Sequence, residues 1–294
     1  MTARSNDAYR ARFQNILTYI DAHLGEDLHL DRLSKLAAFS KHHLLRQFGA
    51  LFGIGIYRYI QLSRLKRASQ QLAFRDDQAV IDIALENGYD NPESFSRAFK
   101  KNFGQTPSEF RKQPQWATWH ATYQPMTELR AHPMQSTSQD HRVTVANVDA
   151  IPVAVLEHRG DPALIGDSIR NFIAWRKQQH LPPNKHATFN ILYDDPDEVE
   201  PAEYHIDLCV ATGQAIEDNA YGIVRKTLPA SRYAVLRHTG SDDRLRQSVY
   251  WLYAEWLPQS GEEPGDFPLY VQRVRFFPDV PEHEAIVDIF LPLK

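Results

Sequence analysis

Apolar residues recur at helical spacing in two stretches of the first half of the chain. SKHHLLRQFGALFG, residues 40–53, and NPESFSRAFKKNFG, residues 91–104, place large apolar side chains at i, i+4 and i+8. Each stretch begins with a good N-cap residue, Ser40 or Asn91, and ends with a glycine suited to a left-handed C-cap. The pattern predicts two similar helices that carry an arginine, Arg46 or Arg97, at the same place.

A shorter helix is predicted before each of these two. It spans about residues 31–38 in the first copy and 79–87 in the second, so each copy has the outline of a helix-turn-helix. Residues 57–75 between the copies read as one helix, roughly 27 Å long at 1.5 Å per residue. Successive major-groove faces of B-DNA lie about 34 Å apart. The spacing therefore predicts two units held over neighbouring grooves of one duplex.

The two copies resemble the AraC/XylS transcriptional regulators. The similarity rests on LDRLSKLAAFSKHHLLRQFGALFG and IALENGYDNPESFSRAFKKNFGQTPSEFR, and it extends over about residues 10–112. It implies a sequence-specific DNA-binding protein that contacts double-stranded DNA in two adjacent major grooves. It also implies RNA polymerase as a second partner. It also implies a set of DNA-contacting positions, with Lys41 near phosphate: Lys41, His42, Leu45 and Arg46 in the first helix, and Pro92, Glu93, Ser94, Ser96 and Arg97 in the second.

Several of these side chains have a clear chemical match in the major groove. Arg46 and Arg97 can each donate two hydrogen bonds to guanine, at O6 and N7, and Glu93 can accept a hydrogen bond from a cytosine amine. Leu45 can touch a thymine methyl group, whereas Pro92 supplies no polar side-chain contact. The residues therefore favour base reading by both helices, without naming the preferred sequence.

Residues 113–141 lack a sustained apolar period. They contain three prolines and end in a stretch rich in Ser, Thr and Gln, which predicts a linker partly ordered by Trp116 and Trp119. The expected organisation is a DNA-binding domain over 1–112, this linker, and a second domain over 142–294.

The sequence of the second domain contains an internal duplication with a period near 80 residues. AVLEHRG at 154–160 matches AVLRHTG at 234–240, and each is followed by an amphipathic helix. Each half ends in a strand, HIDLCVA at 205–211 or IVDIFLPL at 286–293. The expected fold is therefore an all-α domain with two helix-turn-helix units joined by a long helix, then a duplicated α+β domain of two joined sheet-and-helix layers.

Alternation along the closing strands puts a carboxylate opposite each apolar face. Asp207 and Asp288 hold this position in the two halves, so both are expected near a shallow cleft. Trp175, Tyr250 and Trp251 lie off the apolar stripes of the predicted helices and are candidate walls for that cleft. A carboxylate among aromatic rings would attract a cation.

This half resembles the GyrI-like effector-binding domains over about residues 142–294. The similarity rests on AVLRHTG, YWLYAEWLPQSGEEP and the DIFLPL ending. It implies a pocket for small, often cationic and amphipathic effectors with a carboxylate near its centre. Asp288 occupies a place where relatives carry Glu or Asp.

Charge and composition agree with this division. Residues 1–113 hold 17 Lys and Arg against 12 Asp and Glu, a net +5, and the rest hold 16 against 25, a net −9. A basic half suits a polyanion such as DNA. The chain has no apolar run that predicts a signal peptide or membrane span, so a cytoplasmic protein is expected.

Enzymatic chemistry finds little support in the sequence. His205, Asp207 and Cys209 share a strand face, but there is no second His/Cys cluster, no glycine-rich phosphate loop and no HExxH motif, so no enzyme and no cofactor or metal are expected. Three functions stay open. They are an effector-modulated regulator, a constitutive DNA-binding regulator whose second half binds a protein, and a GyrI-like hydrolase fused to a DNA-binding domain.

Overall fold

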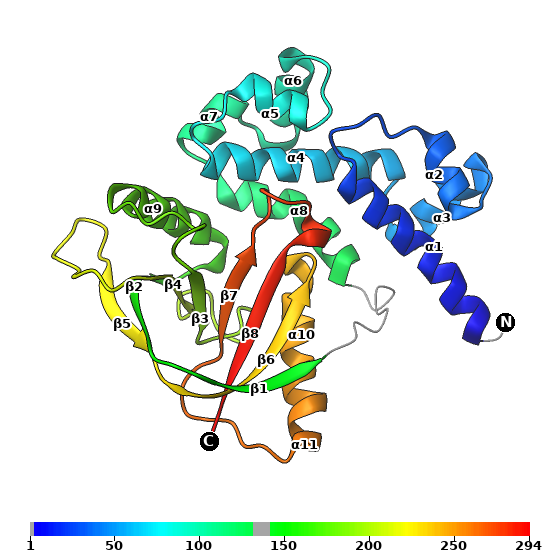
Figure 1. Ribbon diagram of the computed structural model, residues 1–294. Coiled ribbons are helices and arrows are strands. Elements are labelled where there is room, and N and C mark those ends of the chain that lie inside the picture. Colours follow the sequence, from blue (N-terminus) through cyan, green and yellow to red (C-terminus); the bar gives the residue numbers. More distant parts are fainter. Residues whose placement is uncertain (1–2, 132–141) are drawn as a thin grey trace. The chain divides into compact units, whose positions relative to one another are not determined.

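A computed structural model of the protein describes residues 3–131 and 142–294. The chain forms two compact units (Figure 1). The first comprises Met1–Gln139 and Phe277–His283, and the second comprises Asp140–Phe276 and Glu284–Lys294.

The first unit is helical, as the sequence predicts. Its helices are α1 (Ala3–Ala22), α2 (Leu30–Ala37), α3 (Lys41–Phe52), α4 (Ile56–Phe74), α5 (Val80–Glu86), α6 (Pro92–Phe103), α7 (Pro107–Lys112) and α8 (Trp116–Ala131). The pairs α2–α3 and α5–α6 are the two helix-turn-helix units, and α4 joins them. The expected all-α fold with a duplicated helix-turn-helix is therefore confirmed.

The helices α3 and α6 are capped as predicted. The amide of His43 donates to the Ser40 side chain at 3.3 Å, and the amide of Ser94 donates to the Asn91 side chain at 2.8 Å. Each helix ends at a glycine with positive φ. The aromatic residues on their inner faces are buried in one continuous core: Phe48, Phe95, Phe99 and Phe103.

Gly88, in the turn between α5 and α6, is required by close packing as well as by backbone conformation. Its φ is +72°, and a Cβ placed on it would lie 2.7 Å from the Arg64 guanidinium and from the Leu24 carbonyl oxygen. Arg64 donates to the carbonyls of Leu24 and Gly88 at 2.9 and 3.0 Å, so it ties α4 to the end of α1 and to this turn. Ala38 takes the left-handed conformation in the turn between α2 and α3.

The linker prediction is wrong for residues 116–131, which form α8. Four of its apolar residues recur at helical spacing and are buried in the core of the first unit: Trp116, Trp119, Tyr123 and Met126. The Trp119 indole N–H donates to the Ser69 hydroxyl of α4 at 2.6 Å. The prolines favour a linker in the sequence, because proline usually interrupts a helix. Pro125 nevertheless lies inside α8. The Ser/Thr/Gln-rich end of the predicted linker lies outside the described residues.

The second unit is built on one antiparallel sheet of eight strands. They are β1 (Val143–Val148), β2 (Ile151–Arg159), β3 (Thr188–Leu192), β4 (His205–Ala211), β5 (Val224–Leu228), β6 (Ser231–Thr239), β7 (Tyr270–Arg275) and β8 (Ile286–Leu293). Their order is β1-β6-β8-β7-β3-β4-β2-β5. Helix α9 (Ile165–Gln178) follows β2, and α10 (Leu245–Trp251) follows β6 and runs through a π-helical turn, Leu252–Trp256, into α11 (Leu257–Ser260).

The predicted duplication is present, and the two halves share the sheet. The elements β2, α9, β3 and β4 correspond to β6, α10, β7 and β8, and pairing of β3 with β7 joins the halves. Each half repeats the same polar contact between strand and helix. His158 Nδ1 lies 2.8 Å from Ser168 Oγ, and His238 Nδ1 lies 2.8 Å from Ser248 Oγ.

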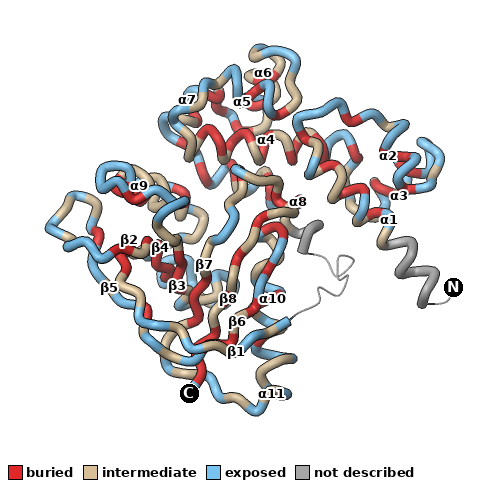
Figure 2. The backbone as a smooth tube through the Cα atoms, viewed as in Figure 1, coloured by how far each residue is buried: buried red, intermediate tan, exposed pale blue. Residues whose placement is uncertain are grey.

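Apolar clusters lie on both faces of the sheet. The strands that carry them contain many buried residues (Figure 2). On one face, called here the helix face, α9 packs on Leu208 and Val210, and α10 packs on Val287 and Ile289. The opposite face carries a third cluster that includes Cys209, with Phe290 packed against it. The alternation predicted for β4 and β8 is therefore confirmed, and Asp207 and Asp288 lie on the face opposite the helices.

Candidate DNA-binding and ligand-binding sites

Helix α3 presents the predicted DNA-contacting residues on its outer surface. Leu44, on the inner face of α3, is fully buried. In contrast, the predicted contact residues of this helix are exposed: Lys41, His42, Leu45 and Arg46. Lys41 pairs with Asp31 at 2.7 Å, and this contact lowers the pKa of the Asp31 carboxyl. The Arg46 guanidinium has no hydrogen-bond or ion-pair partner within the described parts of the chain.

Helix α6 presents an equivalent surface. Glu93 and Arg97 are exposed, and Pro92, Ser94 and Ser96 are half-buried. The Ser94 hydroxyl already donates to the Asn91 carbonyl at 2.9 Å, so it helps to cap the helix. Like Arg46, the Arg97 side chain has no polar partner among residues 3–131 and 142–294. The two arginines occupy matching surface positions on capped, duplicated helices.

Asp207 is fully buried and is already paired with a lysine from another strand. Lys226 Nζ lies 2.7 Å from Asp207 Oδ2 and 2.6 Å from Glu157 Oε1. Tyr193 donates to Asp207 Oδ2 at 3.1 Å, and His205 Nε2 lies 3.1 Å from Oδ1. Partial burial opposes protonation of Lys226, but its hydrogen bonds to the two carboxylates raise its pKa overall. The hydrogen bond from Lys226 lowers the pKa of Glu157.

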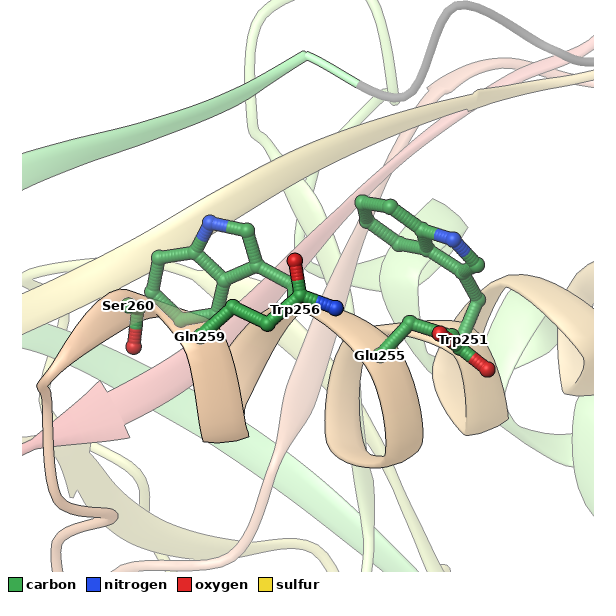
Figure 3. A pocket seen from close by; sticks show the side chains of 5 residues that line it. All are labelled: Trp251, Glu255, Trp256, Gln259 and Ser260. Atoms are coloured by element: carbon green, nitrogen blue, oxygen red, sulfur yellow. The ribbon is translucent and has the colours of Figure 1, made fainter.

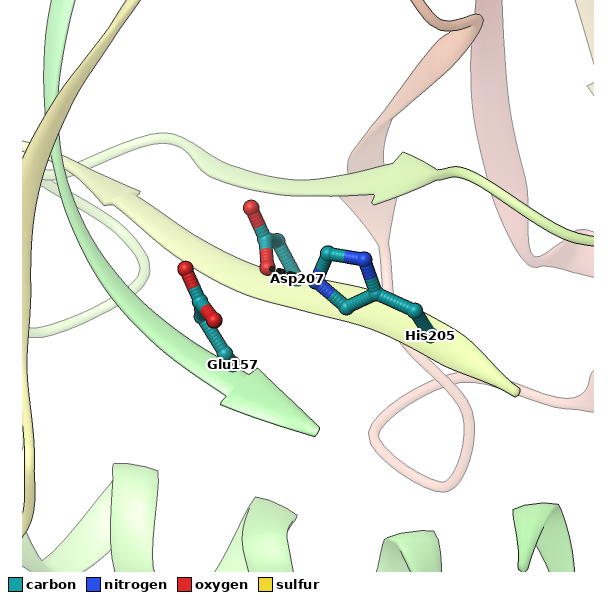
Figure 4. A group of neighbouring side chains, drawn as sticks. All are labelled: Glu157, His205 and Asp207. Atoms are coloured by element: carbon teal, nitrogen blue, oxygen red, sulfur yellow. Dashed lines mark hydrogen bonds and ion pairs between the residues drawn. The ribbon is translucent and has the colours of Figure 1, made fainter. Parts of the chain in front are cut away.

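Glu157, His205 and Asp207 are the kinds of side chain that bind metal ions, and their nearest donor atoms lie within 4.8 Å of one another (Figure 4). However, the Lys226 ammonium already bridges the two carboxylates, and a metal ion would have to displace it. Cys209 follows on the same strand face, and its burial raises the pKa of the thiol, which keeps the thiol protonated. The group is best described as a charge network completed by a lysine.

Asp288 is also paired within the protein. The Arg237 guanidinium on β6 contacts both carboxylate oxygens of Asp288, at 2.7 and 2.8 Å. Strand β8 is separated from β4 by β7 and β3, and three strand spacings amount to about 14 Å. The expectation that Asp207 and Asp288 share one cleft therefore fails, because the halves join through β3 and β7 and not through their closing strands.

The predicted aromatic walls do not lie with these carboxylates. Trp175 is buried in the helix-face core and stacks on Phe172, so the expectation that it is spare is wrong. The Tyr250 hydroxyl contacts Asp195 at 3.0 Å and Glu198 at 2.6 Å. Trp251 lies on α10, which covers the helix face. The carboxylates and the aromatic residues thus belong to opposite faces of the sheet.

A hollow of about 320 Å³ lies along α10, the π-helical turn and α11 (Figure 3). It is lined by Trp251, Glu255, Trp256, Gln259 and Ser260. Residues five apart diverge by about 140° on an α-helix, whereas a π-helix is bonded from i to i+5, which brings such residues to one side. The π-helical turn therefore lets both half-buried indoles line one hollow.

Sequence reasoning found Trp251 but missed Glu255 and Trp256. Both lie in the quoted stretch YWLYAEWLPQSGEEP, and only the i+4 spacing of Glu255 from Trp251 was an available signal. Under α-helical geometry the i+5 position points away from Trp251. The π-helical turn that corrects this is a property of the folded chain.

Comparison with known proteins agrees with both halves of the architecture. Residues 33–113 match a helix-turn-helix domain family, and residues 141–294 match the family of GyrI-like small molecule binding domains. The probable transcriptional regulator YgiV of Escherichia coli K12 is 36% identical over 152 residues, which is 51% of this chain and 95% of that protein.

Two further similarities concern the first half and the whole chain. The right origin-binding protein of Escherichia coli K12 is 36% identical over 106 residues, and the match spans 36% of this chain and 36% of that protein. A cryo-EM structure of an EcmrR–DNA complex in EcmrR-RPo aligns with 90% of this chain and 98% of that chain, at 13% identity and a TM-score of 0.45.

The duplicated helix-turn-helix and the duplicated sheet-and-helix unit together define a DNA-binding transcriptional regulator with an effector-binding domain. The chain belongs to the GyrI-like family and carries an AraC-type helix-turn-helix domain ahead of its GyrI-like domain. Within the described residues, no helix is long and apolar enough to cross a membrane.

Proposed function

We propose that α3 and α6 enter two adjacent major grooves of one DNA duplex, and that a small effector bound by the GyrI-like domain changes DNA affinity or contact with RNA polymerase. In this proposal the protein acts in the cytoplasm and releases its ligand unchanged, so it is not an enzyme. The observation that carries the DNA part is the matched pair of exposed guanidiniums, Arg46 and Arg97, on equivalent capped helices.

A contrast with two other arginines of the first unit supports this assignment. Arg64 binds backbone carbonyls, and Arg75 binds Asp279. Arg46 and Arg97 have no such contact in the described chain, so their donors remain available for guanine. Helix α4 has 19 residues, about 28 Å, which is close to the spacing of successive grooves. The remaining α3 and α6 positions, including Leu45 and Glu93, are proposed to supply the weaker base contacts.

Alanine substitution tests the DNA part directly. Arg46→Ala and Arg97→Ala should each weaken binding to a duplex selected in vitro by about 1–3 kcal/mol, the usual range for a bidentate contact with a base. Arg225→Ala is a matched control, because Arg225 is an exposed arginine of β5 with no polar partner among the described residues. Equal small losses in all three variants would contradict the proposal.

For the effector, the geometry favours the hollow beside Glu255 over the site that the sequence suggested. Asp207 and Asp288 are each neutralised by a cationic side chain of the protein. Glu255 is exposed between two indoles, Trp251 and Trp256, and such a site suits a lipophilic cation through charge and cation–π contact.

Titration with a cation and its neutral isostere tests this site. Benzyltrimethylammonium should bind more tightly than neopentylbenzene, and Glu255→Gln should reduce only the affinity for the cation, by about 0.2–1 kcal/mol, the usual range for an exposed ion pair. Asp288→Asn is the control, and it should leave both affinities unchanged. A loss with Asp288→Asn and none with Glu255→Gln would restore the site at Asp288. Release of choline from an aromatic choline ester, incubated with the protein in a separate assay, would instead support the hydrolase alternative.

A further inference from the structure

The segment Phe277–His283 connects β7 to β8 of the second unit, but its contacts assign it to the first unit. Its main contact is an ion pair between Glu282 and Lys66, which lies in the middle of α4. Lys66 Nζ is 2.8 Å from Glu282 Oε1, and the two side chains are only 9% and 10% exposed. Both charges are therefore largely removed from water, and their short contact offsets part of the desolvation cost of each.

A second ion pair fixes the same segment at the end of α4. The Arg75 guanidinium forks onto Asp279, with Nε at 2.9 Å from Oδ1 and Nη2 at 2.6 and 2.7 Å from Oδ1 and Oδ2. Bidentate pairs of this kind fix orientation as well as distance. Two points on α4, nine residues apart, thus hold two points on a segment of seven residues.

The base of the segment is fixed in the sheet of the second unit. Arg275 at the end of β7 pairs with Glu284 at 2.6 Å, and the amide of Gly240 donates to the Ala285 carbonyl at 2.9 Å. Strand β8 begins at Ile286, four residues after Glu282. Little slack is left in the chain, so a displacement of β8 must either move Glu282 or break its pair with Lys66.

Breaking that pair would remove the short contact between two largely buried opposite charges, which is unfavourable. The segment therefore follows α4, or separates from it altogether. Helix α4 in turn joins the two helix-turn-helix units, through contacts with α3 on one side and with α5 and α7 on the other. A movement of α4 relative to either helix-turn-helix unit changes the relative placement of α3 and α6, on which simultaneous occupation of two grooves depends.

We propose that the segment 277–283 is the link through which the ligand state of the GyrI-like domain controls the spacing of α3 and α6. The proposal rests on the function proposed above, because it assigns the route of effector control. The Lys66–Glu282 pair is the part of the route that holds the segment on α4, and Arg75–Asp279 orients it.

Linkage makes the proposal testable without knowledge of the effector, because coupling between two sites is reciprocal. DNA bound at α3 and α6 must alter β8 if β8 can alter α3 and α6. We would measure hydrogen exchange of β8 amides in the full chain, with and without a duplex selected in vitro. In the wild type, DNA should slow this exchange by about fivefold or more, the lower end of usual coupling strengths.

The variants separate the ion pair from mere stability. Glu282→Gln should abolish the DNA-dependent change in β8. The double variant Lys66→Met/Glu282→Met should restore it, because two apolar side chains can pack where an unpaired charge cannot. Arg159→Met is the control, since it breaks an exposed ion pair with Glu157 at 3.2 Å elsewhere in the second unit, and it should behave as the wild type.

No DNA-dependent change in the wild type, or a full change in Glu282→Gln, would overturn the proposal. Failure of the effector assignment has a different signature. In that case benzyltrimethylammonium gives no binding heat, while the DNA-dependent slowing of exchange in β8 persists.

Discussion

The ammonium group of Lys226 lies 2.7 Å from a carboxylate oxygen of Asp207, which is fully buried on the face of the sheet opposite its helices. The lysine comes from β5 and the aspartate from β4, two strands separated in the sheet by β2. The same ammonium group also pairs with a second carboxylate, that of Glu157 on β2. The most deeply buried carboxylate of the second unit is thus a structural group whose cation is supplied by the protein.

Replacing Lys226 should destabilise the second unit. Lys226→Met leaves Asp207 buried without its cation, and breaking a buried pair costs about 3–5 kcal/mol. Because the Lys226 side chain is 27% exposed and water can reach it, the expected loss is nearer the lower end, about 3 kcal/mol. Urea unfolding measures it. Arg159→Met removes an exposed partner of Glu157 and should change stability by about 1 kcal/mol or less. Equal losses in the two variants would contradict the structural role of Lys226.

The same pair predicts a dependence of stability on alkaline pH. The folded-state pKa of Lys226 is raised by its carboxylate partners, so the unfolded chain releases the proton first. Its contribution is complete below the unfolded pKa of about 10.4 and is lost as pH rises towards the higher folded value. The stability difference between wild type and Lys226→Met should therefore shrink above about pH 10.4. A constant difference across that range would count against the assignment.

His238 predicts a dependence in the acidic range. Burial lowers its pKa, and its ring contacts the Ser248 hydroxyl at 2.8 Å and the Ser241 carbonyl at 3.1 Å. The unfolded chain then binds a proton more readily, so stability falls as pH drops below the unfolded value of about 6.5. In His238→Gln this part of the slope should disappear, which thermal unfolding at several pH values would detect. An unchanged slope would show that other groups cause it.

Gly88 predicts a difference between two glycines of similar conformation. Gly88→Ala should cost more than the roughly 1–2 kcal/mol of a left-handed alanine, because its Cβ would meet Arg64 and the Leu24 carbonyl at 2.7 Å. Gly53 has a φ of +67° with open space around it, so Gly53→Ala should cost only the backbone part. Denaturant unfolding of the two variants gives the comparison, and equal losses would mean that the turn at Gly88 relaxes.

Local sequence patterns predicted the elements of the protein better than its contacts. Capping residues and apolar spacing located α3 and α6, and alternation placed Asp207 and Asp288 on the correct face. These features depend on neighbours along the chain. The prolines of residues 113–131 conceal the apolar spacing of α8, whose helical form also depends on packing against α4.

The partners of the candidate ligand-binding residues could not be predicted in the same way. Lys226 reaches Asp207, and Arg237 reaches Asp288, only because of a strand order that arises from long-range pairing. The hollow at Trp251 and Trp256 depends on a π-helical turn that has no simple sequence signal. Residue types could therefore suggest an effector site, but its position required the fold.

The central claim is that α3 and α6 read two successive major grooves, and base preference measured by in vitro selection tests it most directly. The wild type should select two clusters of preferred base pairs centred about 10 base pairs apart, one helical turn. Arg46→Ala should relax preference in one cluster only, and Arg97→Ala in the other only. If both variants relax the same base pair, or if neither changes the selected sequence, the two helices do not read separate grooves and the account is wrong.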